Sequence, residues 1–238
     1  MCVAAPGAPT PVADRVRVWD LPTRLFHWSL VALVVAAFVS AKMGGHAMPW
    51  HGRIGLAILG LLVFRIVWGV VGSTYARFAQ FVRGPAAIRA YLKGEWQGQG
   101  HNPLGALSVL ALLGALSLQA ITGLFANDDI AFTGYLAPLV ASDTGTALTK
   151  IHYLLEKVSM LLVATHIGAI VFYARVKKHN LVRPMVTGWA AGKPCQSARG
   201  GGLRAFALAA LIAAVSAWAA SGALLTTTPP PPTAAPAW

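Results

Sequence analysis

The stretch IHYLLEKVSMLLVATHIGAIVFY, residues 151–173, decides the fold, because it is apolar, long enough to span a membrane, and carries one histidine near each end. His152 and His166 are fourteen residues apart, close to four helical turns, so both rings project from nearly the same face. Along the helix axis they lie about 21 Å apart, near opposite edges of a hydrocarbon core roughly 30 Å thick. The segment therefore predicts a transmembrane helix that presents one imidazole at each membrane edge.

Composition places the whole chain among membrane proteins. Of its 238 residues, 56% are hydrophobic and only 11% are charged, and the mean hydropathy is +0.62. Runs of about twenty apolar residues predict transmembrane spans at 25–41, 52–72, 104–126, 151–173 and 205–225. We therefore expect an all-α integral membrane fold, in which a four-helix transmembrane bundle is followed by a fifth, C-terminal transmembrane helix.

The basic residues that give the chain its net charge of +12 are distributed unevenly between the connecting segments. Three connecting segments hold 14 Lys and Arg residues between them: 3 in 1–24, 4 in 73–103 and 7 in 174–204. The other three hold 2 in total, namely 1 in 42–50, 1 in 127–150 and none in 226–238. The positive-inside rule then predicts a cytoplasmic N-terminus and a C-terminus outside. We expect the basic residues to contact anionic membrane lipid, and we expect no nucleic-acid partner.

The predicted topology fixes the depth of four histidines. His27, about one turn into the first span, lies at the cytoplasmic edge with His166. His51 starts the second span at the outer edge and matches His152. Two neutral imidazoles can ligate one haem iron from opposite faces, so these pairs predict two haem b groups in a dihaem bundle, one in each leaflet. For any one of these histidines alone, a hydrogen-bonded or edge-located side chain is the alternative.

Three further residues fit this hypothesis. Arg65 is fourteen residues after His51, which places it at the depth of the inner haem, and Arg24 is near the same edge. We expect both arginines to contact haem propionates, although Arg65 could instead extend to the inner interface. Gly55, one turn from His51, could admit a flat porphyrin or serve helix packing.

The remaining histidines have simpler interpretations. His46 and His179 fall in polar connections and are expected to be solvated. His101 stands just before the third span, where a role in helix entry is favoured over iron ligation. No C-x-x-C-H sequence occurs, so covalent haem attachment is not expected, and no nucleotide-binding or hydrolase motif is found.

The chain divides into four segments. Residues 1–14 are rich in Ala and Pro and are predicted to be disordered. Residues 15–190 form the predicted dihaem domain, residues 203–225 the additional helix, and residues 226–238 a proline-rich tail. The fifth helix contains no ionisable group after Arg204, and we consider it a candidate docking element for a partner.

Several motifs resemble the bacterial cytochrome b561 family, in particular the b-type cytochrome subunits associated with nickel hydrogenases. They are VRVWDLPTRLFHW (16–28), HGRIGLAILGLLVFRIVWGVVGSTYARF (51–78), GHNPLGA (100–106), the histidine pair of residues 151–173, and NLVRPMVTG (180–188). The resemblance implies a four-helix dihaem core with His27, His51, His152 and His166 as iron ligands. The fifth helix and the proline-rich tail depart from the family's pattern.

The resemblance also implies electron transfer across the cytoplasmic (inner) membrane of a bacterium, between a redox partner and the quinone pool. A hydrogenase or a c-type cytochrome would be such a partner, and quinone is a candidate ligand. Two alternatives stay open: a self-standing superoxide or quinone oxidoreductase, and a haem-free transporter that relays protons or metal through histidines. Glu156 is the only carboxylate within a predicted span, which counts against the transporter.

Overall fold

A computed structural model describes residues 15–96, 98, 100–130, 132–192 and 196–225. The predicted disordered segment 1–14 and the proline-rich tail 226–238 lie outside the described residues.

Long helices form the body of the protein, and each is long and apolar enough to cross a membrane. They are α1 (Leu21–Met43), α2 (Met48–Val71), α5 (Pro103–Phe125), α6 (Ser142–Arg175) and α8 (Leu203–Ala220). The predicted all-α membrane architecture is thus confirmed. α6 begins nine residues before the predicted span, because its polar first turns continue the helix without contributing to hydropathy. Asp143 lies in that first turn, where a negative charge is favourable.

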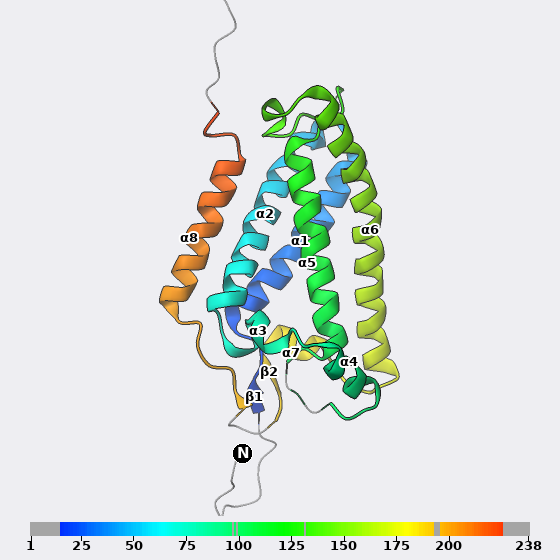
Figure 1. Ribbon diagram of the computed structural model, residues 1–238, viewed down its shortest axis with the longest axis vertical. Coiled ribbons are helices and arrows are strands. Elements are labelled where there is room, and N and C mark those ends of the chain that lie inside the picture. The colour runs from blue at the N-terminus through cyan, green and yellow to red at the C-terminus, as the bar shows by residue number, and fades with distance from the viewer. Residues whose placement is uncertain (1–14, 97, 99, 131, 193–195, 226–238) are drawn as a thin grey trace, which may run out of the picture.

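Short elements close one end of the bundle (Figure 1). β1 (Arg15–Arg17) and β2 (Trp189–Ala191) form a two-stranded antiparallel sheet, and α7 (Val182–Thr187) precedes β2. Between α2 and α5 lie α3 (Phe78–Phe81) and α4 (Pro85–Leu92), the latter opened by a proline at its first turn. We call this end of the bundle the sheet end. The opposite end, which holds residues 127–130 and 132–141, is called the loop end. The sheet is an element that the sequence analysis did not predict.

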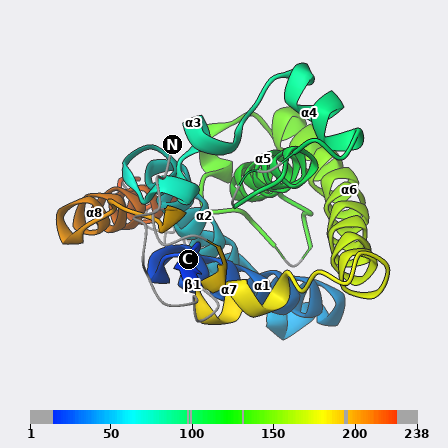
Figure 2. The same cartoon turned by 90° about the horizontal axis from the view of Figure 1, so that it is seen from below.

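The helices pack in a curved row, in the order α1–α2–α5–α6, and Figure 2 shows the row bending so that α6 comes back towards α1. α8 lies outside this row and packs on α2, as both views show (Figures 1 and 2). Its contact face is made of small side chains: Ala209 is fully buried, and Gly60 of α2 faces Ala213 and Ala217. Small residues let the two helices approach closely, which is the usual basis of helix association in lipid.

Asp20 joins the first two helices at the sheet end. Its Oδ1 accepts a hydrogen bond from the backbone N–H of Thr23 (2.8 Å), which caps α1. Its Oδ2 accepts one from the indole N–H of Trp68 in α2 (3.0 Å). Asp20 is buried and Trp68 is completely buried, so this carboxylate satisfies two donors that water cannot reach.

Replacing Asp20 by alanine should therefore destabilise the protein by about 2–4 kcal/mol, since it removes a helix cap and leaves a buried indole N–H without an acceptor. Thermal unfolding in detergent measures the loss. The matched comparison is Asp20→Asn, which keeps one of the two acceptor oxygens and should lose less than the alanine variant. Equal melting temperatures for the alanine variant and the wild type would contradict this role.

Candidate functional site

His51 and His152 face each other at the loop end. His51 lies in the first turn of α2 and His152 in the third turn of α6, and their ring centres are 6.3 Å apart with the planes at 89°. When two imidazoles ligate one metal from opposite sides, each metal–nitrogen bond is about 2 Å long. Adding the distance from each nitrogen to its own ring centre places the two ring centres about 6 Å apart. The two rings are therefore spaced as two axial ligands of one metal would be.

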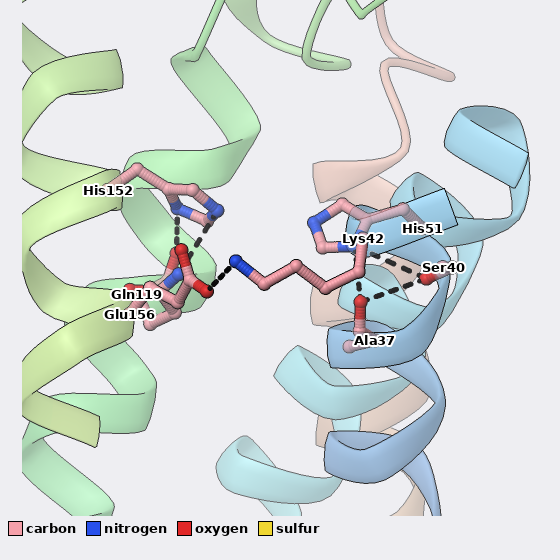
Figure 3. Close-up of polar contacts among 7 residues, drawn as sticks. All are labelled: Ala37, Ser40, Lys42, His51, Gln119, His152 and Glu156. Carbon is pink, nitrogen blue, oxygen red and sulfur yellow. Dashed lines mark hydrogen bonds and ion pairs between the residues drawn. The ribbon is translucent and has the colours of Figure 1, made fainter. Parts of the chain in front are cut away.

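Each ring is held through its Nδ1 atom (Figure 3). His51 Nδ1 lies 2.9 Å from the carbonyl oxygen of Ala37 in α1, and His152 Nδ1 lies 2.9 Å from that of Gln119 in α5. A carbonyl oxygen only accepts, so Nδ1 is the protonated nitrogen in both rings. The side-chain amide of Gln119 donates to His152 Nε2 (3.1 Å), consistent with the same tautomer. Nε2 thus carries the lone pair in both rings, as in a metal-ligating histidine, and a metal at His152 would replace the hydrogen bond from the Gln119 amide.

A cavity of about 310 Å³ lies beside the two rings. Gly55 lines it, and a Cβ atom built there would meet nothing within 4 Å. Gly123 of α5 also lines it, and a Cβ there would come 2.9 Å from His152 Cε1. The Phe132 ring packs edge-on against His51 at 6.1 Å. The two glycines leave space in the cavity, and the Phe132 ring forms one apolar side of it. Such a lining fits a flat, mostly apolar macrocycle.

His27 of α1 and His166 of α6, the second predicted pair, both lie near the sheet end. They lie close enough to interact electrostatically. His166 Nδ1 is 3.5 Å from the Ser108 hydroxyl of α5, and His27 Nδ1 is buried without a hydrogen-bond partner in the described part of the chain. An unpartnered buried nitrogen is costly, so a ligand at this site is physically reasonable.

Arg65 is only 3% exposed, so its side chain does not extend to the surface. Its guanidinium lies 5.1 Å from the ring centre of Phe78 and 6.0 Å from that of Phe81, and its Nη1 atom is buried without a hydrogen-bond partner within the described residues. Arg24 donates through Nη2 to the backbone carbonyl of Val186 in α7, while its Nε is likewise buried and unpartnered. Both arginines thus keep a donor available at the end of the bundle that holds His27 and His166.

His101 is packed between two aromatic rings, with centres 4.6 Å from Trp19 and 4.7 Å from Phe81. The next residue, Asn102, caps α5 by accepting from the Gly105 N–H (2.7 Å), so His101 stands at the helix entry, as expected. Its Nδ1 atom is buried without a hydrogen-bond partner among the described residues. Burial, with smaller contributions from Arg65 and His166, lowers the pKa of His101 to about 3. His46 and His179 are exposed, as predicted.

The contribution of α5 to the two histidine sites was not predicted from the sequence. This helix supplies no histidine within the described bundle, but it supplies Gln119 to His152 and Ser108 to His166. Ser108 and Gln119 are eleven residues apart, three helical turns, and therefore share a face. Isolated polar residues at that spacing in an apolar span were the available signal. Within the described residues, no group of three or more His, Cys, Asp or Glu side chains is placed to hold a metal ion.

The fold and the site define a class: an integral membrane helical bundle with histidines near both ends, of which two face each other at the loop end. The profile of the family described as prokaryotic cytochrome b561 matches residues 18–188, and the chain belongs to this family. Comparisons with curated proteins and with solved structures give no match. Family membership implies electron transport and b-type haem, in agreement with the membrane-like helices.

The low pKa of His101 has a consequence for stability. Below about pH 6.5 the unfolded chain takes up a proton on this ring, whereas the folded protein does so only near pH 3, so the folded state loses stability as the pH falls from 7 towards 4. His101→Gln removes this contribution, and its melting temperature should fall less over that range. Melting curves at pH 7.5, 6 and 5 measure the effect, with His179→Gln as the exposed control. Parallel pH dependences for His101→Gln and wild type would contradict it.

Proposed function

We propose that the protein is a dihaem cytochrome b that carries electrons across the membrane. The observation that supports this most strongly is the loop-end pair, in which His51 and His152 are spaced for one metal and both carry the lone pair on Nε2. His27 and His166 would ligate the second haem iron. Because His152 and His166 belong to one helix, α6 would contribute one ligand to each haem.

The surrounding residues would hold the two groups in place. At the sheet end, Arg65 and Arg24 would pair with haem propionates, since each has a buried guanidinium nitrogen without a partner in the described structure. At the loop end, Gly55 would leave the porphyrin room in the cavity that it lines. The haem supplies one-electron chemistry when bound. The protein's residues fix the imidazole tautomers, exclude water and set the local charge.

Orientation and partners follow from the charge pattern and the family. The sheet end carries most of the basic residues, so we place it and the N-terminus in the bacterial cytoplasm, with the loop end outside the inner membrane. The protein would pass electrons between the quinone pool and a redox protein such as a hydrogenase or a c-type cytochrome. We further propose that the protein is related to the hydrogenase-associated subunits. In this proposal α8 is the helix on which such a partner docks.

Two alternatives differ in their requirements. A self-standing superoxide or quinone oxidoreductase would use the same two haems without a permanent protein partner. A haem-free histidine relay is disfavoured, because the chain belongs to a family that binds haem b. Electron transfer to quinone by the isolated protein, with superoxide as the donor, would favour the first alternative.

Haem content tests the proposal. The wild type should contain two haem b per chain by pyridine haemochrome assay, and replacing His27 or His51 by leucine should leave about one. His46→Leu and His179→Leu are matched controls and should keep both haems, because these rings are exposed. Retention of two haems in every histidine variant, or no haem in the wild type, would refute the assignment.

The size of residue 55 provides an independent test of the loop-end cavity. Gly55→Ala should reduce the haem content less than a large side chain does, because its Cβ atom has no protein atom within 4 Å and adds only one methyl group. Gly55→Phe should fill the space and reduce the haem content from two to about one, while the helix content measured by circular dichroism stays unchanged. Full haem content in Gly55→Phe would show that the porphyrin does not lie in this cavity.

A further inference from the structure

An ion pair connects the two extremes of the helix row beside the loop-end site. Lys42 Nζ lies 2.9 Å from Glu156 Oε1. Lys42 is in the last turn of α1 and Glu156 is in α6, which are the first and last helices of the row α1–α2–α5–α6. Figure 3 shows the lysine side chain extending across to the glutamate, near His51 and His152.

Glu156 is placed to act on this site electrostatically. It follows His152 by four residues and therefore lies on the same face of α6, one turn closer to the sheet end. It lines the cavity, and it is close enough to His152 to interact with it electrostatically. A carboxylate at this position adds negative potential to the cavity unless a cation compensates it.

Lys42 supplies that cation. A lysine near a helix end commonly extends towards the lipid headgroups, but this one reaches across the bundle to the carboxylate. Its ammonium also lies 5.2 Å from the ring centre of Phe38, another residue that lines the cavity. The lysine side chain is 59% exposed and the glutamate side chain 27% exposed, so the carboxylate is the better shielded of the two charges.

We propose that the Lys42–Glu156 pair sets the reduction potential of the haem held by His51 and His152, by keeping the adjacent net charge at zero. This inference rests on the proposed function. Reduction transfers one electron from an external donor to the ferric haem and makes the site more negative by one charge. An unpaired ammonium therefore stabilises the reduced form, and an unpaired carboxylate stabilises the oxidised form.

Spectroelectrochemical redox titration of the purified protein at pH 8 tests this. Lys42→Gln should lower the midpoint potential of the loop-end haem and Glu156→Gln should raise it, whereas the double variant should return close to the wild-type value. The loop-end component is the one that is lost in His51→Leu. The matched control is Lys157→Gln, which removes the same charge from an exposed position next to Glu156 and should shift the potential less.

Opposite shifts distinguish this role from a structural one, since simply loosening the contact between α1 and α6 would affect both single variants alike. Two haems whose potentials stay fixed, or move in the same direction in both variants, would overturn the inference and leave the dihaem proposal intact. Absence of haem from the wild type would instead refute the proposed function. If the single variants lose haem, the double variant Lys42→Glu/Glu156→Lys, which exchanges the two charges, tests the inference. It should retain haem with a near-native midpoint potential, and a large shift of that potential would overturn the inference.

Discussion

The fourteen-residue separation of His152 and His166 on one unbroken helix is the constraint on which the rest of the structure depends. α6 runs for 34 residues from Ser142 to Arg175, so the depth of each ring is set by the rise of the helix and cannot vary independently. Partners for these rings must then come from other helices at two fixed levels. His51 in the first turn of α2 and His27 in the second turn of α1 meet this requirement, because α1 and α2 run in opposite directions.

Hydrogen bonds to the backbone extend this constraint into the chemistry of the site. Carbonyl oxygens of Ala37 and Gln119 accept hydrogen bonds from the Nδ1–H groups of His51 and His152, which leaves the lone pair on Nε2 in both rings. The two carbonyls belong to α1 and α5, so four helices cooperate in orienting two side chains. Any change in the packing of these helices would turn the rings. The orientation of the two imidazoles therefore depends on the packing of all four helices.

Much of this could be predicted from the sequence. Long apolar runs predicted the spans, and the alternating direction of the helices placed four histidines in two pairs at matching depths. The polar first turns of α6 escaped prediction, because residues 142–150 lack the apolar character by which a span is recognised. The sheet of β1 and β2 also escaped, since each strand has three residues and is stabilised by a partner more than 170 positions away.

The surroundings of the histidines were harder to predict, for a physical reason. The partners of His152 and His166 on α5, and of Lys42 on α6, depend on the rotation of each helix about its axis, and apolar spans determine that rotation only through packing. Arg65 illustrates the difference. Its position in the sequence gave its depth but could not show whether the guanidinium extended to the surface, whereas the structure places it against Phe78 and Phe81 with one nitrogen unpartnered in the described residues.

The most direct measurement is to locate iron in an experimental structure of the purified protein, by anomalous diffraction or by cryo-electron microscopy. The account predicts two irons, one between His51 and His152 and the other between His27 and His166, about 21 Å apart along the bundle axis as the helical rise requires. A single iron, or an iron ligated by His101 in place of one of these four histidines, would contradict it.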